Sequence, residues 1–137
     1  MRLLDTNILS ELIRPRPDPC VIACLRRRAD SGLYASELTR FELRRGAWLR
    51  DDPEPLWSRI RASILPLVQW LPLDEAVSLR AGELSAALRR TGCEIGVVDT
   101  LLAATARAHD LVMVTRNVRH FRYIDGLELE NWFDLED

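Results

Sequence analysis

Three carboxylates stand out in the sequence because each of them lies beside apolar residues. Asp5 directly follows the short apolar run Leu3-Leu4. Asp99 is the only charged residue in the segment 95–106, and Glu42 borders the apolar stripe of a predicted helix. An ionised carboxylate in apolar surroundings is costly unless it is paired, hydrogen-bonded or bound to a metal ion. These three acids are therefore our candidates for chemistry.

Each acid also has a purely structural interpretation. Asp5 precedes the apolar residues of a predicted helix, and aspartate is among the preferred N-cap residues. Helix capping could equally satisfy Asp99. Arg40 and Arg45 are close enough to Glu42 in the sequence to form a surface ion pair with it. The residues alone leave both interpretations open.

The elements that must position these acids follow from hydrophobic periodicity and from turn residues. Strands are expected at residues 3–4, 33–35, 68–71, 111–114 and 127–132, and helices at residues 8–13, 21–28, 37–49, 56–65, 74–91 and 95–106. Strands that alternate with helices predict a three-layer α/β/α fold with a central, mainly parallel sheet. The last strand alternates polar and apolar residues, as an edge strand does. With 137 residues, the chain 1–137 is expected to form a single domain.

Composition excludes several classes of function. All nineteen basic residues are arginine, so mechanisms that need a lysine amine, such as Schiff-base chemistry or a P-loop, are excluded. The net charge of −2 leaves any polyanion site to a local patch or to bound metal. The three cysteines lack the spacing of a zinc site and are expected to be reduced thiols. No membrane span or signal peptide is indicated, which predicts a cytoplasmic protein.

The predicted topology brings the acids together. The carboxyl ends of parallel strands meet at one edge of a sheet, which is where ligands bind in open α/β folds. Asp5 and Thr115 end strands at this edge, and Glu42 and Asp99 lie near the starts of helices that approach it. Three carboxylates in one cleft must either raise their pKa values or bind a divalent cation. Oxygen ligands suit Mg²⁺ or Mn²⁺.

Five segments resemble the successive motifs of one known family. They are residues 4–12, 36–43, 96–106, 114–121 and 126–132. Their order and spacing are similar to those of the PIN-domain ribonucleases, and specifically of the VapC-like toxins of bacterial toxin–antitoxin pairs. The resemblance covers nearly the whole chain, and its strength lies in five motifs that occur in order.

The resemblance implies a PIN-like fold and a metal-dependent endoribonuclease that hydrolyses RNA. It implies that Asp5, Glu42 and Asp99 are the catalytic acids and that they hold Mg²⁺ or Mn²⁺ rather than attack the substrate. The cation would polarise the scissile phosphate and lower the pKa of a bound water. A VapB-like antitoxin is the implied partner, and a homodimer is expected.

Several polar residues beyond the last buried strand are possible accessory groups. Many relatives carry a fourth acid near the positions of Asn117 and His120, and this chain has no acid at either position. The amide of Asn117 could still bind a cation, and the imidazole of His120 favours Mn²⁺ over Mg²⁺. Thr115 could position a water or a phosphate, and arginines such as Arg116 and Arg119 would have to grip the substrate.

Two rival functions remain open. The first is phosphoryl transfer with Asp5 as an aspartyl nucleophile; the Asp5-Thr6-Asn7 sequence and the absence of lysine speak against it. The second is a PIN-like module that binds a partner with weak or no nuclease activity, which the missing fourth acid would explain.

Overall fold

A computed structural model describes residues 1–133. The strands are β1 (Arg2–Leu4), β2 (Leu33–Ser36), β3 (Gln69–Leu71), β4 (Val112–Val114) and β5 (Leu129–Glu130). The helices are α1 (Thr6–Leu9), α2 (Pro19–Arg28), α3 (Glu37–Trp48), α4 (Glu54–Ser63), α5 (Glu75–Arg90), α6 (Val97–Ala108) and α7 (Val118–Phe121). Two 3₁₀ helices, Ser10–Ile13 and Leu65–Leu67, follow α1 and α4.

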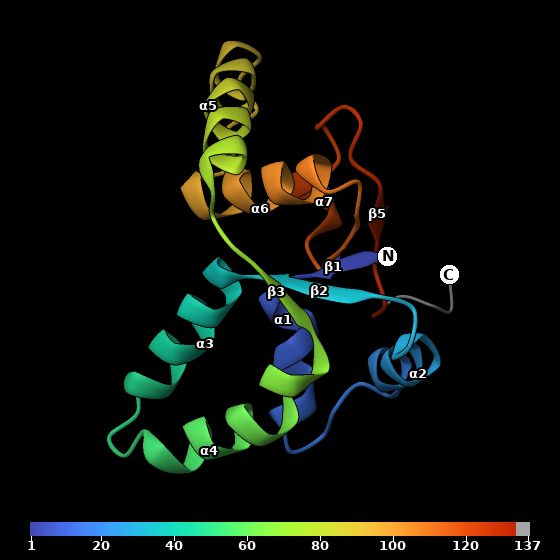
Figure 1. The fold of residues 1–137 in the computed structure, drawn as a ribbon, viewed down its shortest axis with the longest axis vertical. Helices are drawn as coiled ribbons and strands as arrows, with labels where there is room; N and C mark the ends of the chain where they lie inside the picture. Colours follow the sequence, from blue (N-terminus) through green and yellow to red (C-terminus); the bar gives the residue numbers. More distant parts are fainter. Residues whose placement is uncertain (134–137) are drawn as a thin grey trace.

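The strands form one sheet in the order β3-β2-β1-β4-β5, and every neighbouring pair is parallel. The central strand β1 pairs with β2 on one side and with β4 on the other. Strand β5 is an edge strand, as the alternating pattern predicts. The expected α/β fold with a parallel sheet and helices on both faces is confirmed (Figure 1).

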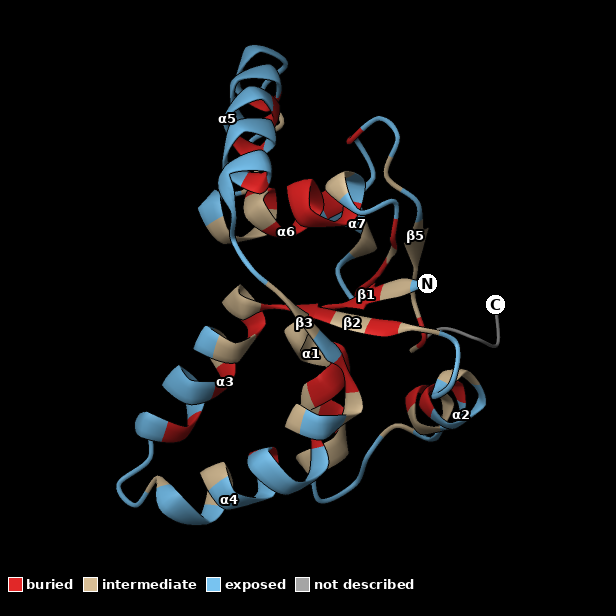
Figure 2. Ribbon diagram, viewed as in Figure 1, coloured by how far each residue is buried: buried red, intermediate tan, exposed pale blue. Residues whose placement is uncertain are grey.

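The two faces of the sheet are covered by different helices because neighbouring strand residues point in opposite directions. Leu4 packs in a cluster with residues of α1, α2, α3 and α4, whereas Leu3 packs with residues of α5 and α6. Met113 and Val114 divide between the two clusters in the same way. Figure 2 shows buried residues along β1 and on the sheet-facing sides of the helices. Burial on both faces explains why the central strands β1 and β4 consist mainly of apolar residues.

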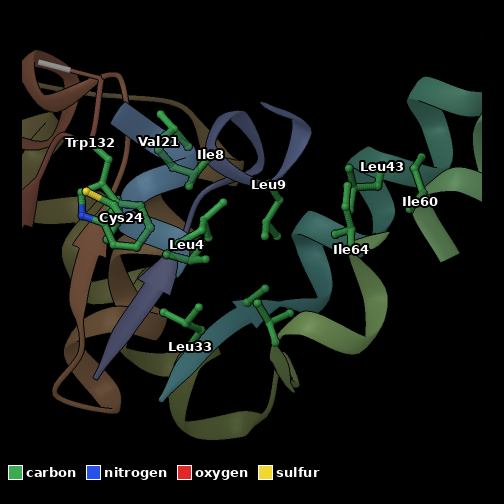
Figure 3. Packing of buried hydrophobic residues seen from close by; sticks show 14 of the residues in the cluster. Leu4, Ile8, Leu9, Val21, Cys24, Leu33, Leu43, Ile60, Ile64 and Trp132 are labelled. Atoms are coloured by element: carbon green, nitrogen blue, oxygen red, sulfur yellow. The ribbon is translucent and has the colours of Figure 1, made fainter. Parts of the chain in front are cut away.

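The larger cluster reaches from the sheet to the end of the described chain. Trp132 is only 2% exposed and lies in the same cluster as Leu4, Ile8, Val21 and Cys24 (Figure 3). Its indole Nε1 donates a hydrogen bond to Glu130 at 3.0 Å, and Glu130 also accepts from the guanidinium of Arg2 at 2.8 Å. These contacts fix β5 against the start of β1.

Three helices begin at a side chain of a type that is preferred at the N-cap. Asp5, Ser36 and Asp74 each accept a backbone N–H at the start of α1, α3 and α5. Asp99 does not cap α6, because Gly96 is the N-cap there with a φ of +91°. Asp99 lies three positions after Gly96 and its carboxylate contacts His120, so the capping interpretation of Asp99 was wrong.

The first helix is shorter than the periodicity predicts. It changes from an α-helix to a 3₁₀ helix at Ser10. Glu11, in this 3₁₀ turn, is 4% exposed and accepts the backbone N–H of Asp18 at 2.8 Å. The turn therefore brings the proline-rich loop back onto the domain. None of the helices in the described part of the chain is long and apolar enough to cross a membrane.

Candidate active site

The candidate site lies where the strand order reverses direction along the sheet. The chain runs outward from β1 to β2 and β3, and then returns to add β4 and β5 on the other side of β1. The carboxyl ends of β1 and β4 therefore flank a topological switch point, the usual ligand position in open α/β sheets. Asp5 follows β1 and Thr115 follows β4 at this point. The two residues are adjacent because the amide of Asp5 donates to the carbonyl of Val114 at 2.9 Å.

Asp5 is buried and hydrogen-bonded on both carboxylate oxygens. Its side chain accepts the backbone N–H of Thr6 at 2.7 Å on Oδ1 and the hydroxyl of Thr115 at 2.9 Å on Oδ2. Asn7 adds a longer contact of 3.4 Å to Oδ2. Asp5 is 6% exposed and Thr115 is fully buried, so solvent contributes little to either group. Asp5 thus both caps α1 and presents a carboxylate at the sheet edge.

The electrostatics of Asp5 connect it to the other two acids. The pKa of Asp5 is raised from 3.8 to about 6, mainly by burial and in smaller part by the negative charges of Asp99 and Glu42. Hydrogen bonds from Thr115 and Thr6 favour the ionised form and limit the rise in pKa. Asp5 therefore lies within the electrostatic influence of both partners named by the sequence.

Glu42 reaches the site from α3 and is linked to it through Thr6. The hydroxyl of Thr6 donates to Oε1 of Glu42 at 2.6 Å. Arg40, which the sequence offered as an ion-pair partner, instead binds Glu37 with a shortest contact of 2.6 Å. Thr6 therefore joins the acid on α3 to the residue that caps α1, and Glu42 is only half-buried.

Asp99 stands in the first turn of α6 and faces His120 of α7. His120 Nδ1 and Asp99 Oδ2 are 2.7 Å apart. Both side chains keep contact with solvent, with 27% of Asp99 and 45% of His120 exposed. The third acid is thus held by an imidazole rather than by the backbone.

The acids approach one another without forming a finished metal cluster. Within residues 1–133, no three His, Cys, Asp or Glu side chains lie close enough together to hold a metal ion as they stand. Glu42 is turned toward Thr6 and Asp99 toward His120. The structure brings the three carboxylates to one edge of the sheet, and their role as ligands stays a prediction.

Two residues that sequence reasoning did not single out join the segments of the site. Thr6 donates to Glu42, and Asn7 accepts the backbone N–H of Arg116 at 3.2 Å through its side-chain oxygen. Asn117 was proposed as an accessory ligand; its backbone N–H donates to Thr115 Oγ1 at 3.0 Å. The sequence feature that could have identified Thr6 and Asn7 is that both are polar residues close to Asp5 at a strand end.

Comparison with known proteins identifies the family. The PIN domain family matches residues 2–127. The chain is 36% identical to toxin FitB of Neisseria gonorrhoeae, over 98% of this chain and 100% of that protein. It is 34% identical to the VapC ribonuclease Y4jK of Sinorhizobium fredii, over 96% of both chains.

Solved structures agree with this result. The crystal structure of FitAcB from Neisseria gonorrhoeae matches with a TM-score of 0.90 over 98% of this chain and 100% of that chain, at 36% identity. VapBC2 from Rickettsia felis, bound to a DNA fragment from its promoter, matches with a TM-score of 0.87 over 96% and 98% of the two chains, at 29% identity. The chain therefore belongs to the PIN-domain family, among the VapC- and FitB-like toxins of bacterial toxin–antitoxin systems.

Proposed function

We propose that this chain is a metal-dependent endoribonuclease that hydrolyses RNA phosphodiester bonds as the toxin of a toxin–antitoxin pair. The observation that carries the proposal is the carboxylate of Asp5, buried at the sheet's switch point under the influence of two further acids. The similarity to a VapC ribonuclease over 96% of both chains supports the same activity. The sheet runs from residue 2 to residue 130, which supports one domain over residues 1–137.

The residues present fit a divalent cation, and metal dependence is typical of PIN-domain nucleases. Asp5, Glu42 and Asp99 supply only oxygen donors, which suits Mg²⁺ or Mn²⁺. The raised pKa of Asp5 reflects burial and negative neighbours, and a bound cation would offset both. When bound, a cation supplies charge stabilisation at the phosphate and a more acidic water.

The chain's own residues fix the geometry around that position. Thr115 and Thr6 orient the two oxygens of Asp5. The hydroxyl of Thr6 holds Glu42, and the imidazole of His120 holds Asp99. Ligand binding would require the carboxylates of Glu42 and Asp99 to turn from these partners toward Asp5. Hydrogen bonds that orient the ligands of a metal are worth about 10- to 100-fold in metal affinity or activity.

We infer that a small VapB-like antitoxin covers the site. An acidic pocket attracts a guanidinium or an ammonium group. The partner would wrap the surface formed by α1 and α3 and insert an Arg or Lys toward the three acids. Phe41 and Trp48 on α3 support this docking surface, since their side chains are 58% and 45% exposed. We place the protein in the cytoplasm, where its RNA substrate and its antitoxin are made.

We also infer a homodimer. The best support is the region where α5 and α6 pack against each other, in which Val97 at the start of α6 is 76% exposed. A hollow of about 240 Å³ lies between the same helices and includes Val97 and Leu101 in its lining. Apolar surface that is exposed beside a hollow is a candidate for burial in a protein interface.

Cleavage of RNA by the purified protein tests the proposed function. We expect cleavage of single-stranded RNA with Mg²⁺ or Mn²⁺, none in EDTA, and none by Asp5→Asn. Asp51→Asn, at an exposed loop position, is the matched control and should cleave as wild type does. Cleavage by Asp5→Asn in metal-free buffer at the wild-type rate would rule out the mechanism.

The toxin assignment needs a separate experiment in cells. Expression of the chain alone should arrest growth, and co-expression with the adjacent antitoxin gene should restore growth and allow the two proteins to be copurified. A protein that binds the antitoxin but neither cuts RNA nor arrests growth would instead be the partner-binding module allowed by the missing fourth acid.

A further inference from the structure

A pocket lies beside the acids and is lined by basic and amide side chains instead of carboxylates. Its volume is about 440 Å³, and it is lined by Arg116, Asn117, Val118, Arg119, His120 and Asn131. Among the described residues, the lining therefore contains two guanidinium groups, one imidazole and two amides, and no carboxylate. Its volume falls in the range of about 300–1,000 Å³ that is usual for ligand pockets.

The basic pocket shares a wall with the acids. His120 lines the pocket and also contacts Asp99 at 2.7 Å. Asn117 lines it as well, and its backbone N–H donates to Thr115, whose hydroxyl donates to Asp5. A chain of phosphates that reaches the three acids can therefore continue directly into the basic pocket.

One of the two pocket arginines is held in place by its surroundings. The guanidinium carbon of Arg116 lies 4.5 Å from the centre of the Phe133 ring. Its backbone N–H donates to the side chain of Asn7, which anchors the start of the loop to α1. A guanidinium stacked on a ring keeps its N–H groups at its edge, where they can bind a phosphate in a bidentate manner.

We propose that this pocket binds one nucleotide of a single-stranded RNA next to the scissile phosphate, with the nucleotide's own phosphate between Arg116 and Arg119. The inference rests on the proposed ribonuclease function and adds the group that holds the strand. Two arginines opposite a phosphate form charge-assisted hydrogen bonds. The amide of Asn117 supplies donors and an acceptor for a sugar or a base edge. A base can enter such a pocket only from an unpaired strand, where it is free to leave the stack.

RNA binding by a cleavage-inactive protein tests the proposal. All proteins carry Asp5→Asn, and the probe is a fluorescein-labelled single-stranded RNA of about 12 nucleotides, a length within reach of usual site sizes. The pocket variant is Arg116→Gln with Arg119→Gln. The control is Arg80→Gln with Arg90→Gln, which removes the same charge from exposed positions of α5. Thermal unfolding of both variants shows whether they fold as the parent does.

The pocket variant is expected to bind the RNA about tenfold or more weakly than the parent, and the control within about twofold, because an arginine that binds phosphate contributes affinity irrespective of sequence. The slope of log affinity against log salt should become shallower by about 0.7 for the phosphate that is no longer neutralised. Arg116→Lys with Arg119→Lys should restore the slope, because it restores the charge. In otherwise wild-type protein with metal, the Gln pair should raise KM and leave kcat within about threefold.

Three results would overturn this inference without touching the ribonuclease assignment. One is equal RNA affinity for the pocket variant and its parent. Another is an equal loss in the control pair, which would mean that only net charge matters. The third is unchanged RNA binding with loss of antitoxin binding, which would make the pocket a protein site. Failure of the wild-type protein to cut RNA is recorded in a different assay and bears on the proposed function instead.

Discussion

The two sides of the candidate site are built differently. On the sheet side, Asp5 is 6% exposed and accepts hydrogen bonds from the residue that follows it and from Thr115, at the end of the neighbouring strand. On the helix side, Glu42 and Asp99 are partly exposed, and each carboxylate is directed at one polar side chain. The sheet fixes one acid, whereas the helices leave the other two able to turn.

This difference divides two properties between the acids: one acid is oriented for a ligand in advance, and the other two cost the fold little while no ligand is bound. A carboxylate that is buried and bonded on both oxygens is already oriented for its ligand, at a cost in electrostatic free energy that its raised pKa records. Carboxylates on helix surfaces reduce the stability of the folded protein only slightly while no ligand is bound. Substitutions on the sheet side are therefore expected to have larger effects than the matching substitutions on the helix side.

Lengthening an aspartate side chain to glutamate should reduce cleavage activity far more at Asp5, on the sheet side, than at Asp99, on the helix side. We expect Asp5→Glu to reduce metal-dependent cleavage by more than about 100-fold, because the longer acid cannot keep both hydrogen bonds in a close-packed site. Asp99→Glu should lose no more than about tenfold, since its side chain is 27% exposed and has room to adjust. Initial rates on one RNA substrate at saturating Mg²⁺ measure the contrast. Equal losses in the two variants would contradict it.

The raised pKa of Asp5 predicts a dependence of stability on pH in EDTA. The pKa is about 6 in the folded protein and near 3.8 in the unfolded chain, so the unfolded chain releases its proton first as pH rises. The contribution of Asp5 is therefore fully present below pH 4 and is lost as pH rises through 6. The free energy of unfolding should fall by roughly 2–3 kcal/mol from this group.

Asp5→Asn isolates that contribution. The variant should match wild type in stability at pH 4 and exceed it by roughly 2–3 kcal/mol at pH 8 in EDTA. Urea unfolding followed by tryptophan fluorescence reports the stability at both pH values. A stability difference that does not change with pH would contradict the assigned cause.

The hydroxyl groups that orient the acids should also differ in importance. Thr115→Val removes a fully buried hydroxyl that donates to Asp5 and accepts from the backbone of Asn117. We expect it to cost about 1–3 kcal/mol of stability, because the buried carboxylate of Asp5 loses a hydrogen-bond donor. Thr6→Val, beside the half-buried Glu42, should cost about 1 kcal/mol or less. Thermal and urea unfolding measure the loss of stability in each variant. A larger loss in Thr6→Val than in Thr115→Val would contradict the prediction.

The smallest expected effect concerns the choice of metal. His120 contacts Asp99 at 2.7 Å, and an imidazole favours Mn²⁺ over Mg²⁺. Wild type is therefore expected to cleave RNA with Mn²⁺ at least as well as with Mg²⁺, and His120→Asp should shift the ratio of the two rates toward Mg²⁺ by a few-fold. A clear Mg²⁺ preference in wild type that the substitution leaves unchanged would exclude a role for His120.

Local signals in the sequence predicted most of the fold. The apolar runs located the strands, and Asp5, Ser36 and Asp74 marked helix starts because cap chemistry involves residues only a few positions apart. The change to a 3₁₀ helix at Ser10 was missed, because it accompanies a contact between buried Glu11 and Asp18 that periodicity does not encode.

The partners of the acids were less accessible to sequence reasoning. Asp5 and Thr115 are 110 positions apart, and their hydrogen bond exists only because β4 returns to pair with β1. The contact of Asp99 with His120 likewise depends on how α7 packs. Parallel topology predicted that these residues converge at one edge, but not which side chain each carboxylate would contact.

The position of β1 between β2 and β4 has a consequence for the order in which the protein becomes active during its synthesis. Asp5 can accept the hydrogen bond from the hydroxyl of Thr115 only after the ribosome has made more than 100 further residues. At about 5–20 residues per second, this takes several seconds or more. A nascent chain that stops short of β4 carries Asp5 but lacks the hydroxyl of Thr115 that orients it. The carboxylate of Asp5 therefore acquires its full set of hydrogen bonds only after most of the chain has been made.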